Sequence, residues 1–235
     1  MKSEKRGDKN GILLINKPQG ITSHDVVDCV RRKLRIKKVG HAGTLDPMAT
    51  GLLILLLGKF TKRANLFMGY DKEYDGELLL GESTDTRDRE GAIISKKDPE
   101  PYRSLLEDPE NVIRKFKGAI KQVPPMYSAK KFKGKKLYEL ARKGITVPRE
   151  PVTVCIKELR VSAISFPRIS FYVRCSKGTY VRQLAHDIGE EIGCGAHLVK
   201  LERVGIGPYK ISGALLLESL EEDERIFCES ILQPE

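Results

Sequence analysis

Runs of apolar residues predict the first elements of this chain. Residues 11–15 (GILLI) and 51–57 (GLLILLL) are continuous apolar stretches with the length of buried strands. Between them we expect a helix that begins at Ser23 as its N-cap and presents one apolar face. That face consists of Val26, Val27, Val30 and Leu34.

The rest of the pattern indicates a mixture of strands and helices. Strands are predicted at 72–81, 151–164 and 169–175, and helices at 61–67, 104–116, 137–143 and 180–192. The elements interleave without the regular spacing of βαβ units, so an α+β fold with a mixed sheet is expected. Residues 118–150 contain too many glycines and prolines for a simple core element, which predicts an insertion there.

Charge is unevenly distributed along the chain. The net charge is +10, from 42 Lys and Arg against 32 Asp and Glu. Eleven basic residues and one acid lie between Arg114 and Lys143, a second basic cluster lies at 31–38, and residues 218–235 hold seven acids and one Arg. Concentrated positive charge attracts polyanions, and nucleic acid is the obvious candidate. A solvated basic face is the alternative, and composition alone does not separate the two.

Several classes of protein are excluded by composition. The longest strongly apolar run, 52–57, is far shorter than the ~20 residues that span a bilayer, so we expect no membrane association. A charged N-terminus without a following apolar region predicts a cytoplasmic protein. Five cysteines without a CxxC pair argue against a disulfide framework. Cys194 and His197 have ligand-like spacing but no second pair, so no metal site is predicted.

One loop combines glycines with polar side chains. Residues 40–50 lack periodicity, and Gly40 and Gly43 allow close approach of the backbone to a ligand. His41 and Asp46 supply the polar groups, and Asp46 is a candidate nucleophile or general base. The alternative is a turn aspartate before a proline, which local features favour.

A second polar cluster, 175–182 (CSKGTYVR), joins a predicted strand to a predicted helix. Tyr180 and Arg182 bracket the expected helix start, where an anion or a base can bind. An arginine near Asp46 would keep that carboxylate ionised, and an aromatic ring could stack on a base. A helix cap beside a surface arginine is the alternative. Phosphate-binding, dinucleotide-binding, nucleophile-elbow and zinc-protease motifs are absent from the sequence.

Five blocks of sequence, in order over roughly residues 11–210, resemble the TruB family of bacterial tRNA pseudouridine synthases. The resemblance implies a pseudouridine synthase fold, with a mainly antiparallel central sheet flanked by helices. It also implies isomerisation of uridine 55 in the T arm of tRNA, without metal or organic cofactor, by a monomer. The blocks are Lys17-Pro18-x-Gly20-x-Thr22-Ser23, GHAGTLDPMATG (40–51), Lys72-Glu73-Tyr74 with Gly81-x-Ser83-Thr84-Asp85-Thr86, CSKGTYVRQLAHDIG (175–189) and GCGAHLVKLERVGIG (193–207).

The same resemblance implies three catalytic residues. Asp46 matches the catalytic aspartate, which acts on a flipped-out uridine either as a nucleophile or as a base that gives a glycal. Tyr74 matches the tyrosine expected to stack on the target uracil. Arg182 matches the arginine that pairs with the catalytic carboxylate.

Substrate-binding residues are implied in the same way. Tyr180 and Leu201 match positions that line the pocket, and His41 matches the histidine that holds flipped-out nucleotides. Lys17 belongs to a motif beside the active site. The basic stretch, including Lys130 and Lys131, resembles an RNA-gripping segment and is expected to meet phosphates.

Two departures from the family pattern affect the expected RNA contacts. Most relatives continue into a C-terminal PUA-type domain, so we expect residues 1–235 to form a single catalytic domain without it, with the basic insertion at about 118–150. Glu202 stands where the family usually carries Arg, which removes one expected phosphate contact.

Two other functions remain open. One is a guide-RNA-dependent pseudouridine synthase subunit, and the other is a non-catalytic tRNA-binding or tRNA-folding module. Asp46 and Arg182 are both present, which argues against the second.

Overall fold

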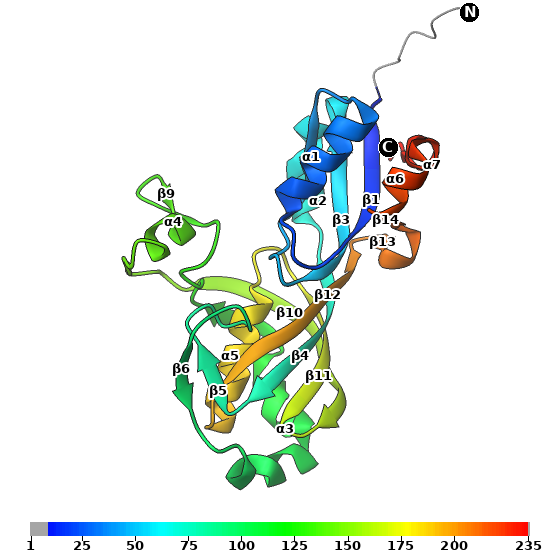
Figure 1. Ribbon diagram of the computed structural model, residues 1–235. Helices are drawn as coiled ribbons and strands as arrows, with labels where there is room; N and C mark the ends of the chain where they lie inside the picture. The colour runs from blue at the N-terminus through cyan, green and yellow to red at the C-terminus, as the bar shows by residue number, and fades with distance from the viewer. Residues whose placement is uncertain (1–8, 235) are drawn as a thin grey trace, which may run out of the picture. The chain divides into compact units, whose positions relative to one another are not determined.

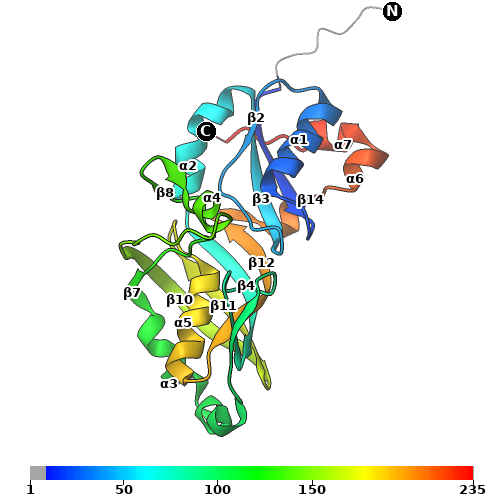
Figure 2. The same ribbon diagram turned by 60° about the vertical axis from the view of Figure 1, so that its left-hand side comes forward.

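The computed structural model describes residues 9–234 and forms two compact units (Figures 1 and 2). Unit 1 comprises the chain up to Glu73 and the segment from Glu202 onward, and unit 2 comprises Tyr74–Leu201. The boundary falls inside two strands, β4 (Lys72–Leu80) and β12 (Ala196–Ile206). The prediction of one domain over residues 1–235 stays a prediction.

A large mixed sheet confirms the expected α+β fold. Its hydrogen-bonded order is β14-β1-β3-β12-β4-β11-β10-β7, with β2 on β3 and β13 on β12. The β1–β3, β2–β3, β10–β11, β7–β10 and β12–β13 pairs are antiparallel, whereas β1–β14 and β3–β12 are parallel. The sheet is therefore mainly antiparallel.

Two strands at the centre of unit 1 are buried on both faces. In β1 (Gly11–Lys17) and β3 (Thr50–Leu57), alternate residues join two different apolar clusters, one against α1 and one against α2. This burial explains why both strands are apolar without alternation. The other elements of unit 1 are α1 (Ser23–Leu34), β2 (Val39–His41), η1 (Gly58–Arg63), α2 (Ala64–Gly69), β13 (Tyr209–Lys210), η4 (Ile211–Gly213), β14 (Leu215–Leu216), α6 (Ser219–Glu222) and α7 (Glu224–Glu229).

The start of α1 differs from the prediction by one residue. Thr22, not Ser23, is the N-cap, because the Thr22 hydroxyl accepts a hydrogen bond from Asp25 N and the Asp25 carboxylate accepts one from Thr22 N. This reciprocal pair is a capping box. Ser23 is buried and makes a different contact, with Leu45.

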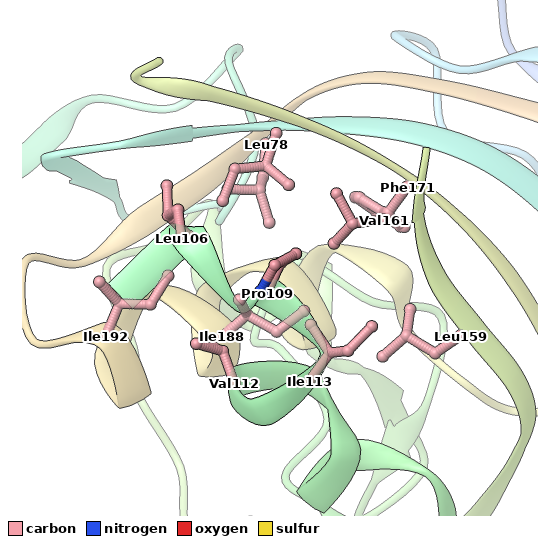
Figure 3. A pocket seen from close by; sticks show the side chains of 11 residues that line it. Leu78, Leu106, Pro109, Val112, Ile113, Leu159, Val161, Phe171, Ile188 and Ile192 are labelled. Carbon is pink, nitrogen blue, oxygen red and sulfur yellow. The ribbon is translucent and has the colours of Figure 1, made fainter. Parts of the chain in front are cut away.

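Unit 2 is built around the long hairpin β10 (Val152–Ser165) and β11 (Arg168–Cys175), with α5 (Val181–Ile192) on the same side of the sheet as α3 (Figure 1). An apolar pocket between α3, α5 and the strands β4, β10 and β11 has only apolar lining residues, as Figure 3 shows. It offers packing and no polar chemistry. The remaining elements are β5 (Glu82–Thr84), β6 (Ile93–Lys96), η2 (Glu100–Glu107), α3 (Pro109–Ile113), η3 (Arg114–Phe116), β7 (Gly118–Gln122), β8 (Lys131–Phe132), β9 (Lys135–Lys136) and α4 (Leu137–Ala141).

Two other predictions of secondary structure were wrong in detail, and one long strand was missed. The single helix expected at 104–116 is three short pieces, because Asp108 caps a new helix whose first residue is Pro109. The helix expected from residue 61 is preceded by the 3₁₀ turn η1. The strand β12 was not predicted from periodicity at all.

The Thr22 cap gives a stability prediction. Replacing Thr22 with Ala removes the acceptor for Asp25 N, so the free energy of unfolding should fall by about 1 kcal/mol. Denaturant unfolding followed by circular dichroism measures the change. Thr146→Ala, at an exposed coil position, is the matched control and should leave stability nearly unchanged. Equal losses in the two variants would contradict the capping role.

Candidate active site

Asp46 lies in a loop of unit 1 whose backbone is held at successive residues. Leu45 N donates to the Ser23 hydroxyl over 2.9 Å, and that hydroxyl donates to Leu45 O over 3.2 Å. Ala49 N donates to Asp46 O, and Gly20 N donates to Pro47 O. Asp46 itself is only half-buried. The loop therefore presents a carboxylate on a fixed backbone, shortly before the first residue of β3.

Lys17 also holds this loop through hydrogen bonds. Its side chain is completely buried, and Nζ donates to Pro18 O and Ile21 O at 2.8 Å and to Pro47 O at 3.4 Å. A desolvated ammonium needs such acceptors. The predicted role of Lys17 in substrate binding stays a prediction, and these three hydrogen bonds are to backbone carbonyls.

A second buried cation, Arg203, links the start of the loop to the strand β3 that follows it. Its Nε donates to Leu52 O over 2.7 Å, and its Nη2 donates to Gly43 O over 3.2 Å. Arg203 is 1% exposed. Beside it, Gly51 has φ +103°, and a Cβ there would lie 2.5 Å from Arg203 O. Glycine is thus required at position 51 both by its backbone conformation and by the close approach of β12.

His41 lies at the start of the loop, on β2, and is partly buried. Burial lowers the pKa of its imidazole below the ordinary 6.5, and the positive charge of Arg203 lowers it further. A smaller effect in the same direction comes from His24, while the Gly43 backbone acts in the opposite direction. The neutral imidazole is therefore favoured, with one nitrogen that donates and one that accepts.

In unit 2, Arg182 is buried and ion-paired. Its Nη1 lies 3.2 Å from Asp88 Oδ2 and also donates to Thr86 O, while Nη2 donates to Tyr127 O over 2.8 Å. Both partners of the pair are at most 5% exposed. The alternative of a surface arginine is wrong. Removing one partner would leave a buried charge unpaired, at a cost of about 3–5 kcal/mol.

Tyr180 is held by a buried amide. Gln122 Nε2 donates to Tyr180 O over 3.1 Å, and Tyr180 N donates to Gln122 Oε1 over 2.8 Å. Tyr180 is the N-cap residue of α5, so this pair fixes the point where the helix starts. Tyr180 is half-buried, which leaves part of its side chain exposed to solvent.

The remaining predicted site residues differ in exposure. Tyr74 on β4 and Leu201 on β12 are 9% and 8% exposed. Lys130 and Lys131 are exposed, at the start of the small β8–β9 hairpin, and Leu137 N donates to Lys130 O. Unit 1 thus carries Lys17, His41 and Asp46, whereas unit 2 carries Tyr74, Lys130, Lys131, Tyr180, Arg182 and Leu201.

Three buried polar residues that contact predicted site residues or the Asp46 loop were not predicted from the sequence. Asp88 pairs with Arg182, Gln122 holds Tyr180, and Arg203 bridges the Asp46 loop. The quoted sequence blocks ended two residues before Asp88, and Arg203 lies beside Glu202 in a charged stretch. A buried arginine demands a buried acceptor, and that requirement is the one signal that could have directed attention to Asp88.

The described part of the chain holds neither a candidate metal site nor a helix that could span a membrane. Residues 9–234 contain no group of three or more His, Cys, Asp or Glu side chains that could hold a metal ion. His197 lies 3.0 Å from Glu82 O through Nδ1, a structural contact. Among the same residues, no helix is both long enough and apolar enough to cross a bilayer.

The environment of His41 gives a prediction about pH. Because its pKa is lowered in the folded protein, the unfolded chain binds the extra proton first as pH falls below 6.5. His41 should therefore reduce the free energy of unfolding as pH falls from 6.5 to its folded-state pKa, and contribute nothing above 6.5. An NMR titration of the imidazole should give a midpoint below 6.5. In His41→Gln this part of the pH dependence should disappear, and a midpoint at or above 6.5 in the wild type would contradict the inference.

Comparison with known proteins identifies the family. A family model described as TruB family pseudouridylate synthase (N terminal domain) matches residues 31–181, and one described as tRNA pseudouridylate synthase B C-terminal domain matches 182–234. Proteins named tRNA pseudouridine synthase B from Syntrophotalea carbinolica and Clostridium tetani are 47% and 48% identical. The matches cover 90% and 91% of this chain and 69% and 73% of those relatives.

Solved structures agree with this assignment. The structure entitled "Crystal Structure of a Cbf5-Nop10-Gar1 Complex" contains a chain that matches with a TM-score of 0.72 and 27% identity. The match covers 99% of this chain, which spans 62% of the length of that one. The sequence blocks, the mainly antiparallel sheet and both comparisons lead to one conclusion: the chain belongs to the TruB family of pseudouridylate synthases.

Proposed function

We propose that this chain isomerises uridine to pseudouridine at position 55 in the T arm of tRNA, with Asp46 as the catalytic carboxylate. Membership of the TruB family and 45–48% identity to three proteins named tRNA pseudouridine synthase B support the reaction and the substrate. The observation that carries the assignment of Asp46 is its place, half-buried, on a loop whose backbone is fixed on both sides of it.

The proposed chemistry is balanced without a co-reactant. The C1′–N1 glycosidic bond breaks, the uracil rotates, and a C1′–C5 bond forms. C5 loses its proton and N1 gains one, either by direct transfer or by exchange of both protons with solvent. The product has the atoms and the oxidation state of the substrate. The Asp46 carboxylate either forms a transient covalent bond or removes a sugar proton, and both roles require an ionised, oriented oxygen.

Orientation is the contribution that the described contacts support best. Ser23 and Lys17 hold the loop of Asp46 through the backbone, so the carboxylate is placed before substrate arrives. Preorganisation of this kind lowers the barrier, because the enzyme does not reorganise during the reaction. The pairing of Arg182 with the catalytic carboxylate, and the stacking of Tyr74 on the uracil, stay proposals.

RNA binding in this proposal relies on shape and charge. A uridine within the stacked T loop must be extruded, which costs a few kcal/mol. The neutral imidazole of His41 can serve as donor or acceptor to a displaced nucleotide. Exposed lysines of the 118–150 insertion, including Lys130 and Lys131, provide charge for phosphates. Tyr180 and Leu201 are proposed to line the pocket.

A guide-RNA-dependent subunit is the second candidate, because the solved chain of a Cbf5-Nop10-Gar1 complex is similar over nearly the whole of this chain. The higher identity to proteins named tRNA pseudouridine synthase B favours the first candidate. An unmodified tRNA transcript, incubated with the protein without guide RNA and mapped for pseudouridine, separates them. Product at the T-loop uridine supports the first candidate, and product only when a guide RNA is present supports the second.

Asp46→Asn tests the catalytic assignment. The amide keeps the shape of the side chain but can act neither as nucleophile nor as base, so product should vanish while tRNA binding persists. Pseudouridine mapping and filter binding measure the two quantities. Asp223→Asn, which removes a carboxylate from the N-cap of α7, is the control and should retain activity. Loss of binding in Asp46→Asn would show a structural aspartate instead.

Charge removal tests the basic insertion. Changing Lys130, Lys131 and Lys133 together to Ala should raise KM and reduce the dependence of KM on salt, because each phosphate contact releases counterions. The turnover at saturating tRNA should change little, since none of the three is proposed to touch the reacting atoms. An unchanged salt slope would show that these lysines do not contact the RNA.

A further inference from the structure

We infer that Arg203 is a positioning residue for the reaction. It hydrogen-bonds to Gly43 near the start of the Asp46 loop and to Leu52 just after its end, and it thereby fixes the position of the Asp46 carboxylate. This inference rests on the proposed function, because it assigns a role within that reaction. The two hydrogen bonds on which the inference rests lie inside unit 1.

The first support is the geometry of the two hydrogen bonds. Arg203 Nε reaches Leu52 O in β3, just after the C-terminal end of the loop, and Nη2 reaches Gly43 O near its N-terminal end. A planar guanidinium presents these donors in a fixed fork, so the distance between the two carbonyls is set by one rigid group. A lysine, with a single ammonium on a flexible chain, has no such fork.

The second support is the close approach of the Arg203 backbone to Gly51. Arg203 is paired with Gly51 in the parallel β3–β12 register, and a Cβ at Gly51 would lie 2.5 and 2.6 Å from Arg203 O and N. The backbone of β12 is therefore pressed against the end of the loop, with no space between them. Arg203 is anchored on one side of the loop by its backbone and reaches the other side with its side chain.

The third support is electrostatic. The charge of Arg203 acts on His41, whose pKa is lowered by burial first, by Arg203 next and by His24 to a smaller extent. These are the charged groups that act on this imidazole. One buried cation therefore ties the loop of Asp46 and favours the neutral form of the neighbouring His41.

A positioning role differs measurably from a purely structural one. If Arg203 only stabilises the fold, its variants unfold more easily but the folded molecules turn over normally. If it positions Asp46, the folded variant loses kcat while tRNA binding remains, because a displacement of about 1 Å can cost ~10²-fold in rate.

The experiment uses the full chain with Arg203→Met and Arg203→Lys, beside Arg225→Met as the matched control. Arg225 also lies in unit 1 but is largely exposed and paired with Asp223 on α7. Circular dichroism establishes folding for each variant. Single-turnover pseudouridine formation on a tRNA transcript gives the rate, and filter binding gives the affinity. NMR measures the titration of His41 and the hydrogen exchange of the Leu45 and Ala49 amides.

For Arg203→Met we expect a rate about 10²-fold lower with little change in affinity, faster exchange at Leu45 and Ala49, and a His41 midpoint that moves up toward 6.5. Arg203→Lys keeps the charge but loses the fork, so it should lose rate and loop protection while its His41 midpoint stays near the wild-type value. Arg225→Met should match the wild type throughout.

Two outcomes would overturn the inference. One is a folded Arg203→Met or Arg203→Lys with wild-type rate. The other is unchanged exchange at Leu45 and Ala49 in both variants. If Arg203→Met does not fold, Arg203→Lys decides by rate and exchange. Failure of the proposed function is distinguishable, because the wild type itself would then form no pseudouridine, whereas the exchange and titration readouts would still report on the loop.

Discussion

Burial of both faces of the β1–β3 pair is the constraint on which unit 1 depends. Alternate residues of each strand enter opposite apolar clusters, so neither strand can shift by one residue without exchanging its two faces. The register of β3 in turn fixes where the chain leaves the strand at Thr50. Because the Asp46 loop ends there, the hydrophobic core determines the position of one end of this loop.

Besides the hydrophobic core, buried cations also fix the position of the Asp46 loop. Lys17 and Arg203 are both almost fully desolvated, and each donates to loop carbonyls that would otherwise lack part of their hydrogen bonding. Arg182 follows the same principle in unit 2, where Asp88 and two carbonyls surround its guanidinium. In each unit, these buried cations therefore hydrogen-bond to backbone carbonyls. Their burial cost is offset by hydrogen bonds that only the folded loops provide.

The sequence predicted the elements whose apolar pattern is simple. The strands β1, β3, β10 and β11 and the helices α1 and α5 lie within a few residues of their expected limits, because continuous runs and one-sided helical faces are local signals. The strand β12 was not predicted because Lys200, Glu202 and Arg203 interrupt its apolar residues. Arg203 packs inward only because β3 and the loop supply acceptors, and those partners are distant in sequence.

The candidate site divides in the same way. Asp46 could be singled out from a glycine-containing loop, and its assignment came from the family blocks rather than from local features. Asp88, Gln122 and Arg203 could not be found so readily, since each is defined by a contact partner and not by a pattern around it. The N-cap of α1 shows that the sequence alone does not identify the capping residue to within one position. Both Thr22 and Ser23 are good N-caps, and only the contact of Ser23 with Leu45 determines which one is used.

That contact of Ser23 has a consequence for thermal inactivation. The Asp46 loop is held by contacts with the first turn of α1, with Lys17 at the end of β1 and with Arg203 of β12, and all of these residues belong to unit 1. Fraying at the start of α1 would release Leu45 and loosen Asp46 while the β10–β11 hairpin of unit 2 stayed intact. On heating, the enzyme should therefore lose its activity at the temperature where this one helix end opens, before the bulk of its secondary structure melts.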